Sequence, residues 1–242
     1  MKYAIIAAGE GSRLAAEGIN APKPMVKVHG EHLIDRLIRA FMQNGAEEIV
    51  AICNDRNPVV RQHLLDLQSQ GLQGQPVPLQ FKVRNTPSSM HSFYELREFL
   101  GDAPFVLTTV DTIFRENEFQ EYVKAFEDVL KHDGDGLMGV TSYIDDEKPL
   151  YVGTDGDMTV TGFYDSNDMH CSFISGGIYG LVPSALQTLE NCMKRGESRM
   201  RNFQRGLIRD GRKLKAYAFS KVLDIDHASD IKKAEDFLSE NA

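Results

Sequence analysis

The sequence predicts an α/β fold of three layers, with helices on both faces of a mainly parallel, mixed sheet. Two observations lead to this prediction. Up to residue 135, apolar runs typical of buried strands alternate with segments of helical periodicity, an order that requires parallel strands and crossover helices. After residue 136 come short strand candidates separated by turns, which indicates antiparallel strands added to the same sheet.

The first half of the chain is expected to hold four strands and four helices. The strands are expected at 2–7, 48–53, 79–83 and 105–109, and the helices at 33–42, 59–67, 89–100 and 118–131. Gly45 ends the first of these helices. Between the first strand and the first helix, residues 8–24 are expected to form an irregular loop, and residues 25–28 a short extended piece.

The second half is expected to begin with a strand meander and to end in helices. The strands are expected at 136–143, 150–153, 159–164, 177–181 and 214–219, and the helices at 183–193, 199–209 and from the N-cap Ser229 to Leu238. Because no repeat or linker divides the chain, we expect a single domain over residues 1–242, with halves at 1–135 and 136–242.

Composition excludes several classes of partner. A net charge of −8 over 242 residues argues against binding to nucleic acid or to an anionic membrane, although one phosphorylated small molecule needs only a local positive charge. Three widely spaced cysteines indicate neither a disulfide framework nor a zinc site, so a cytoplasmic location is expected. The first residues lead directly into a strand, and we expect neither a signal peptide nor a membrane span.

The loop after the first strand carries the strongest functional signal. It reads Ala7-Ala8-Gly9-Glu10-Gly11-Ser12-Arg13-Leu14, and Pro22-Lys23-Pro24 follows. Small residues that expose backbone amides, together with two cations, are suited to phosphate. The GxG pattern alone is equally typical of a tight turn. A dinucleotide site would need a third glycine where Leu14 stands and a helix that begins at once, so that interpretation fits poorly.

The combination GxGxRL and PKPMV resembles the sugar-phosphate nucleotidyltransferases, the NDP-sugar pyrophosphorylase-like NTP transferases. The resemblance implies a Rossmann-like fold of the nucleotide-diphospho-sugar transferase type, with a nucleotide-binding half at 1–135 and an acceptor-binding half at 136–242. It also implies a Mg²⁺-dependent enzyme of nucleotide-sugar biosynthesis. Such an enzyme joins NMP from a nucleoside triphosphate to a sugar phosphate or a related phosphorylated alcohol, and releases pyrophosphate.

The chemistry of this reaction explains the residue types in the loop. Backbone at Ala7, Ala8, Gly9, Gly11 and Ser12 is expected to approach the triphosphate. Arg13 is a planar donor for the β- and γ-phosphates, where charge develops, and otherwise it would form a surface salt bridge. Lys23 is a mobile point charge that is expected to act on the α-phosphate and on the incoming phosphate of the acceptor.

Two aspartates are expected to hold Mg²⁺. Asp111 follows an apolar strand, and ligands gather at the carboxyl ends of parallel strands. The resemblance implies that Asp226 in Asp224-Ile225-Asp226 is the second ligand. Without this resemblance, each of the two aspartates could equally be a turn residue or a helix-cap residue. We assign no role to His227.

The remaining site residues follow from the resemblance. Asn85 and Ser89 are expected near the base and ribose, although small polar residues here could equally cap a helix. Ser175 and Gly177 stand in Ile174-Ser175-Gly176-Gly177-Ile178-Tyr179, which resembles a family strand that lines the acceptor pocket. Nucleic acid and membranes are still not expected as partners. A homo-oligomer is compatible with the sequence.

Asp165 marks a departure from the family pattern. Many members carry Glu-Lys-Pro after this strand, with the lysine on the sugar phosphate, whereas this chain has Tyr164-Asp165-Ser166. An acid here suggests an acceptor with its own positive charge, such as a phosphorylated amino alcohol; alternatively Arg199 or Arg201 replaces the lysine. Two rival functions are a metal-dependent glycosyltransferase that uses a nucleotide sugar, and a non-catalytic nucleotide-binding domain. The base and the acceptor are not specified by the sequence.

Overall fold

The fold is built on one nine-stranded mixed sheet, described here from a computed structural model that covers residues 1–145 and 147–240. Its first half is parallel. β1 (Lys2–Ala7) lies at the centre and pairs with β4 (Glu48–Cys53) and β6 (Phe105–Thr109), and β5 (Leu79–Val83) forms the edge. The α/β class and its mixed sheet are therefore as the sequence predicts.

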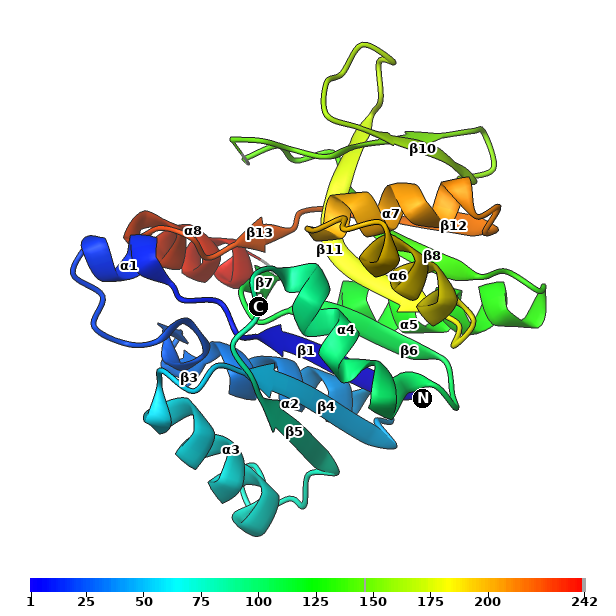
Figure 1. The fold of residues 1–242 in the computed structure, drawn as a ribbon. Coiled ribbons are helices and arrows are strands. Elements are labelled where there is room, and N and C mark those ends of the chain that lie inside the picture. The colour runs from blue at the N-terminus through cyan, green and yellow to red at the C-terminus, as the bar shows by residue number, and fades with distance from the viewer. Residues whose placement is uncertain (146, 241–242) are drawn as a thin grey trace.

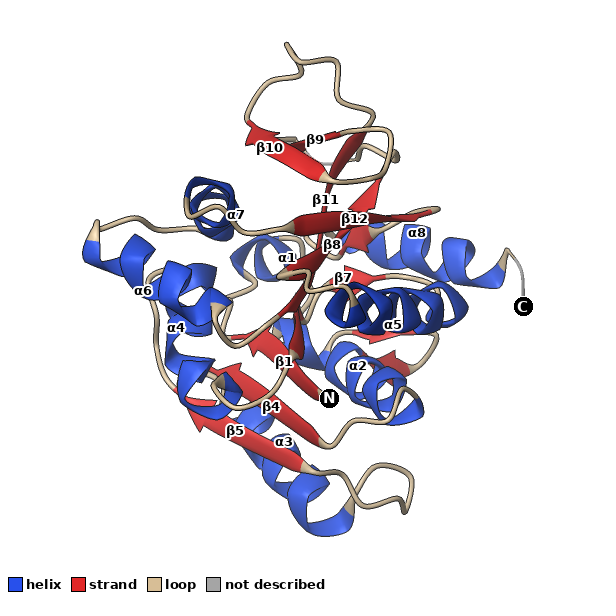
Figure 2. Ribbon diagram, turned by 90° about the vertical axis from the view of Figure 1, so that its right-hand side faces the viewer, coloured by secondary structure: helices blue, strands red, loops and turns tan. Residues whose placement is uncertain are grey.

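Helices cover both faces of this sheet (Figure 2). One face carries α2 (Leu33–Gln43), α3 (Pro58–Gln70), α5 (Glu116–Lys131) and α8 (Ala228–Ser239). The other carries α4 (Ser89–Leu100), α6 (Ala185–Lys194) and α7 (Met200–Arg209). Side chains of β1 alternate between the two cores, with Tyr3 and Ile5 in one and Ala4 and Ile6 in the other. This double burial explains why the strand is apolar throughout.

The second half extends the sheet with antiparallel pairs. β11 (Phe173–Leu181) pairs with β6 at one end and with β9 (Tyr151–Thr154) at the other, and β9 pairs with β10 (Val160–Tyr164). β8 (Gly136–Thr141) lies between β11 and β12 (Leu214–Phe219). Figure 1 shows β11 rising from the main sheet to the β9–β10 hairpin above it. Because one sheet joins both halves, the topology supports the single domain that we propose.

Two short ribbons complete the fold. β2 (Lys27–Val28) and β3 (Glu31–His32) form a hairpin whose turn residues, His29 and Gly30, both have positive φ, as a two-residue type I′ turn requires. β7 (Thr112–Ile113) pairs with β13 (Leu223–Asp224). This pairing places the segment after β6 beside the segment before α8. This second ribbon matters for the site, because it brings distant parts of the chain together.

The structure corrects two local predictions. Residues 8–24 are not an irregular loop throughout: they contain the short helix α1 (Ser12–Ala16), where burial of Leu14 favours the helical turn, and the start of the 3₁₀ turn η1 (Lys23–Met25), which also includes the first residue of the predicted extended piece. The N-cap of α8 is His227, and not Ser229. The helix begins earlier because Asp230 accepts the His227 N–H at 2.8 Å and Glu17 accepts the Ala228 N–H at 2.7 Å.

Smaller differences concern element ends. α3 continues to Gln70, α5 begins at Glu116, and β11 begins at Phe173, whereas the sequence predicts 67, 118 and 177 at these points. The helix α4 and the strands β1, β4, β5, β6 and β12 have the predicted bounds. Among the described residues, no helix is both long enough and apolar enough to cross a membrane.

Candidate active site

The loop after β1 lies at the carboxyl end of the central strand, next to the ends of β4 and β6. Gly11 has φ +62°, a conformation that favours glycine, and a Cβ added there would lie 3.4 Å from the Cβ of Lys23, in contact with it. Asn54, buried directly after β4, donates to the carbonyl of Ala8 at 3.1 Å and of Gly9 at 3.4 Å. The neighbouring strand thereby fixes the loop.

Lys23 lies at the centre of the charged cluster. Its Nζ donates to Asp111 Oδ2 at 2.5 Å and to Asp226 Oδ1 at 2.7 Å, and its side chain is only 11% exposed. Burial disfavours the ammonium, but the charges and hydrogen bonds of Asp111 and Asp226 outweigh it and raise the pKa of Lys23. The lysine is therefore a cation at all physiological pH values. Two of its three donors point to carboxylates, which leaves the third for a further acceptor.

Arg13 extends the cluster toward solvent. Its Nη1 donates to Asp226 Oδ2 at 3.1 Å, and its side chain is 59% exposed. Asp226 is thus contacted by one cation at each carboxylate oxygen. Four side chains that the sequence singles out, on segments more than 200 residues apart, converge within a few ångströms: Arg13, Lys23, Asp111 and Asp226.

Asp111 carries an unmatched acceptor. Its Oδ1 is buried and has no hydrogen-bond partner among the described residues, although Oδ2 is bound by Lys23. A buried carboxylate oxygen without a donor is costly, unless a cation or water meets it. With Asp226 half-exposed beside it, the donor set is the one that Mg²⁺ prefers, namely one or two carboxylates with room for phosphate and water oxygens. The residues therefore fit the ion.

The β7–β13 ribbon brings the two aspartates together. Asp111 immediately precedes β7 and Asp226 follows β13, and the N–H of Ile225 donates to the carbonyl of Asp111 at 3.1 Å. On the far side, Asp230 accepts the N–H of Asp226 at 3.1 Å and thus fixes the backbone of the second aspartate.

Glu17, at the end of α1, contacts the residues that directly follow Asp226. It binds the ring Nδ1 of His227 at 2.6 Å in addition to the Ala228 N–H. The hydrogen bond that the His227 ring donates to Glu17 raises the pKa of His227, and the same bond lowers the pKa of Glu17. The segment with Arg13 is therefore tied directly to the segment with Asp226.

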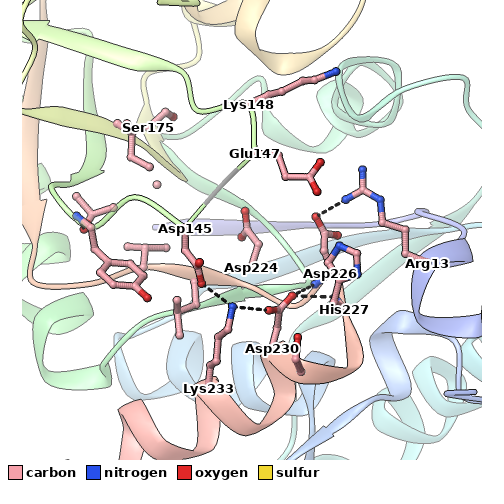
Figure 3. Close-up of a pocket in the computed structure, with 17 residues that line it drawn as sticks. Arg13, Asp145, Glu147, Lys148, Ser175, Asp224, Asp226, His227, Asp230 and Lys233 are labelled. Atoms are coloured by element: carbon pink, nitrogen blue, oxygen red, sulfur yellow. Dashed lines mark hydrogen bonds and ion pairs between the residues drawn. The ribbon is translucent and has the colours of Figure 1, made fainter. Parts of the chain in front are cut away.

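A cavity of about 320 Å³ opens beside this cluster (Figure 3). Arg13 and Asp226 form one wall, and Lys233, which contacts Asp145 at 2.9 Å and Asp230 at 3.2 Å, forms another. Lys148 lies at the opposite rim. The lining is rich in carboxylates, contributed by Asp145, Glu147, Asp224, Asp226 and Asp230. Such a cavity offers many acceptors for hydroxyl groups and a few cations for phosphate.

Of the predicted acceptor residues, one lines the cavity. Ser175 does so, and its hydroxyl donates to Gln204 at 2.9 Å. Gly177 does not line it, but has φ +71° at the bulge that turns β11 between Ser175 and Ile178. Asp165 lies outside the lining and pairs with Arg201 at 2.6 Å and Arg205 at 2.7 Å. Its charge is therefore already balanced within the protein, and its acceptor role stays an unsupported prediction.

The predicted base-side residues lie at the ends of β5 and α4. Asn85 exchanges two hydrogen bonds with Asp55, at 2.7 and 3.3 Å. Ser89 is the first residue of α4, whereas its neighbour Ser88 supplies the cap by accepting the His91 N–H. Both assignments to the base remain predictions.

Several site residues have no counterpart in the sequence-based assignment. Asn54, Glu17 and Asp230 position the loop and Asp226, and no motif marks them. A signal for Lys148 did exist, because Glu147-Lys148-Pro149 has the residue types of the family's Glu-Lys-Pro. It stands before β9 and not after β10, where the family pattern places it.

Comparison with known proteins supports one family. The profile described as nucleotidyl transferase matches residues 2–241. A UTP–glucose-1-phosphate uridylyltransferase from Haloferax volcanii is 24% identical over 99% of this chain and 97% of its own length. A glucose-1-phosphate cytidylyltransferase from Salmonella typhimurium is 30% identical over 63 residues, a match that covers 26% of this chain and only 24% of that enzyme.

Solved structures share the fold. A putative glucose-1-phosphate thymidylyltransferase from Bacillus anthracis has a TM-score of 0.84 at 17% identity, covering 100% of this chain and 96% of that one. An inositol-1-phosphate CTP transferase from T. maritima has 0.76 at 17% identity, covering 100% and 97%. A CTP:phosphocholine cytidylyltransferase from Streptococcus pneumoniae has 0.75 at 17% identity, covering 98% and 99%.

Proposed function

The chain belongs to the nucleotidyl transferase family, and from this premise we propose that it transfers a nucleoside monophosphate from a nucleoside triphosphate to a phosphorylated small-molecule acceptor. Pyrophosphate is the second product. The single observation that best supports this activity is the convergence of Lys23 with Asp111 and Asp226, beside an Asp111 oxygen that has no partner among the described residues.

The residues suggest how the triphosphate binds. We expect the backbone amides of the Gly9–Gly11 turn to bind the phosphates, and the space beside Gly9 is open, since a Cβ added there would meet nothing within 4 Å. Arg13 is exposed and therefore free to turn its guanidinium toward the β- and γ-phosphates, where negative charge develops as pyrophosphate leaves. The remaining donor of Lys23 is available for the α-phosphate.

The reaction itself needs no protein nucleophile. An oxygen of the acceptor phosphate attacks the α-phosphorus in line, a new P–O bond forms, and the bond between the α-phosphorus and the bridging oxygen of pyrophosphate breaks. At neutral pH the acceptor phosphate is largely ionised, since its second pKa is about 6. Hence the protein contributes by positioning and by charge, through Arg13 and Lys23.

Asp111 and Asp226 are the residues that would hold Mg²⁺. When bound, the ion neutralises charge on the phosphate oxygens. Asp230, through the backbone N–H of Asp226, and the β7–β13 ribbon fix the two carboxylates at their positions. Lys23 keeps the two like charges together and stays protonated beside them.

For the acceptor we propose a phosphorylated polyol or sugar, with Lys148 near its phosphate. The cavity beside Asp226 offers carboxylates and Ser175 for hydroxyl groups, and Lys148 lines the same cavity. Arg201 donates to the carbonyl of Lys148 at 3.0 Å, which orients that segment. The acid at Asp165 gives little support to a cationic acceptor, because two arginines neutralise it.

A pyrophosphate-release screen tests the proposal. Each of the four nucleoside triphosphates is incubated with Mg²⁺ and one phosphorylated acceptor, drawn from hexose 1-phosphates, inositol phosphates and phosphorylated amino alcohols. We expect release only when one triphosphate and one acceptor are both present, and none after EDTA treatment. No release with any pair would contradict the proposal, and transfer from a nucleotide sugar instead would identify a glycosyltransferase.

A further inference from the structure

A second cluster of potential metal ligands lies outside the proposed active site. His32 Nδ1 is 3.0 Å from one oxygen of Asp35, and His63 Nε2 is 2.6 Å from the other. The three ligand atoms all lie within 4.8 Å of one another, and the two imidazole rings meet edge to face with centroids 5.2 Å apart. Nothing in the proposed nucleotidyl transfer uses these residues.

The cluster joins three elements of the fold. His32 ends β3, Asp35 lies in the first turn of α2, and His63 projects from α3, which lies at the lower edge of the sheet (Figure 1). The Asp35 residue is 9% exposed, whereas both histidine side chains are partly accessible. His32 and Asp35 also line a surface depression of about 560 Å³. An ion could thus reach the ligands from solvent.

The donor set and its spacing fit a borderline divalent metal. Zn²⁺ binds imidazole nitrogen and carboxylate oxygen at about 2.0–2.2 Å, so adjacent ligands of a tetrahedral site lie roughly 3.4 Å apart. The two separations from Asp35, 3.0 and 2.6 Å, are shorter than this because they are hydrogen-bond distances, but all three ligand atoms lie within 4.8 Å of one another, so small side-chain rotations would bring them to this spacing. Two imidazoles with one carboxylate favour zinc over magnesium, which prefers oxygen ligands and strict octahedral geometry.

We propose that His32, Asp35 and His63 form a Zn²⁺-class metal site that ties the β2–β3 hairpin and α2 to α3. Solvent in the depression would supply the remaining coordination position. Each histidine would bind through the nitrogen that now faces Asp35, with its ring proton on the other nitrogen. The hairpin follows η1, the turn that carries Lys23, and the Leu33 N–H donates to the carbonyl of Val26 at 2.9 Å. A metal here would therefore stabilise the segment that supplies the catalytic lysine.

Calorimetry with Zn²⁺ alone tests the site. The full chain, treated with a chelator and then freed of it, is titrated with ZnCl₂ in excess Mg²⁺, so that the Asp111–Asp226 carboxylates are occupied by Mg²⁺. We expect one equivalent of Zn²⁺ to bind and to raise the thermal midpoint. His32→Gln and His63→Gln should each weaken this binding by at least about tenfold, as loss of a ligand would. His132→Gln, at an exposed histidine that directly follows α5, is the matched control and should bind normally.

Cobalt provides an independent signature. Co²⁺ in the wild-type site should give visible absorption bands of a low-symmetry site, and both histidine variants should lose them. The proposal is overturned if Mg²⁺ displaces all bound Zn²⁺, or if neither histidine variant weakens binding; the cluster is then only a hydrogen-bonded carboxylate between two histidines. Asp35→Asn is not needed for this decision, because the two histidines are partly exposed and their variants are expected to fold. Pyrophosphate release is not measured in these experiments, so a negative result for the zinc site does not bear on the proposed reaction.

Discussion

Lys23 donates to Asp111 across 2.5 Å while the same ammonium reaches Asp226 across 2.7 Å. A lysine from the loop after the first strand thus holds together two carboxylates from the middle and the end of the chain. Without the cation, the two negative charges would repel at short range in a partly buried place. The stability of this cluster and its ability to bind phosphate therefore depend on the same side chain.

The first prediction concerns loss of that lysine. Lys23→Ala should lower the rate of pyrophosphate release by about 10²–10³-fold, the effect seen when one donor to developing charge is removed. The fold should survive, because the sheet and both cores do not involve the Lys23 side chain. Lys27→Ala, an exposed lysine on the adjacent ribbon, is the matched control and should keep wild-type turnover.

Thermal melting gives a second readout of the same variant. Once Lys23 is removed, only a divalent ion can offset the repulsion between Asp111 and Asp226. Mg²⁺ should therefore raise the melting midpoint of Lys23→Ala more than that of the wild type. An equal Mg²⁺ effect in both proteins would show that the two carboxylates do not bind the ion together.

The second prediction concerns the Oδ1 atom of Asp111, which has no hydrogen-bond partner among the described residues. Asp111→Asn keeps the shape of the side chain but removes its charge, so turnover should fall by at least about 10²-fold and the Mg²⁺ concentration for half-maximal rate should rise. Asp128→Asn, an exposed aspartate on α5, is the control and should change neither quantity. Near-normal turnover with unchanged Mg²⁺ dependence would argue against Asp111 as a ligand.

The order of strands and helices was accessible from the sequence because it depends on local periodicity. β1, β4, β5, β6 and β12 have their predicted bounds; β1, β4 and β6 are buried apolar runs, whereas β5 and β12 alternate apolar and more exposed residues. Arg13, Lys23, Asp111 and Asp226 could be chosen because residue type and motif mark them. Their contacts could not be predicted, because the short β7–β13 ribbon that joins Asp111 to Asp226 has too few residues to show a pattern.

The supporting residues were missed for the same physical reason. Glu17 and Asp230 act by accepting backbone N–H groups at the start of α8; the Asp230 contact is local, whereas the Glu17 contact spans 211 residues and depends on tertiary placement. The predicted N-cap at Ser229 was wrong because a serine near a helix start is a common signal, whereas here the helix begins at a capping box between His227 and Asp230, and Glu17 from α1 accepts the next N–H. Asp165 was interpreted from its charge and from its place in the family pattern, and its arginine partners follow only from the fold.

The third prediction is a pH dependence of stability away from the site. Glu197, between α6 and α7, is partly buried, which disfavours its charge, but hydrogen bonds from Arg195, Cys192 and Arg209 outweigh this and lower its pKa to about 2 from 4.5. A carboxylate with a depressed pKa stabilises the fold at pH values above 4.5, and this contribution is lost as pH falls toward 2.

Acid unfolding of Glu197→Gln measures this contribution. At neutral pH the variant should be less stable than the wild type, and the difference in free energy of unfolding should shrink between about pH 4.5 and 2. Glu121→Gln removes an exposed pair with Lys124 on α5, and its difference from the wild type should be small at every pH. A Glu197→Gln difference that persists unchanged at pH 2 would mean that its cause is packing and not charge.

The fourth prediction separates two assignments of the acceptor phosphate. Lys148 lines the cavity beside Asp226, whereas Asp165 lies outside it and is paired with Arg201 and Arg205. Lys148→Ala should therefore raise KM for the acceptor by about tenfold or more, the loss of one charge-assisted hydrogen bond, with KM for the nucleotide unchanged. Asp165→Asn leaves the lining intact and should change neither constant by more than about twofold.

The opposite outcome would assign the acceptor site to Asp165. If Asp165→Asn selectively weakens the binding of a cationic phospho-alcohol and Lys148→Ala has no effect, the acid and not the lysine defines the acceptor. Steady-state kinetics with each substrate varied in turn distinguish the two outcomes.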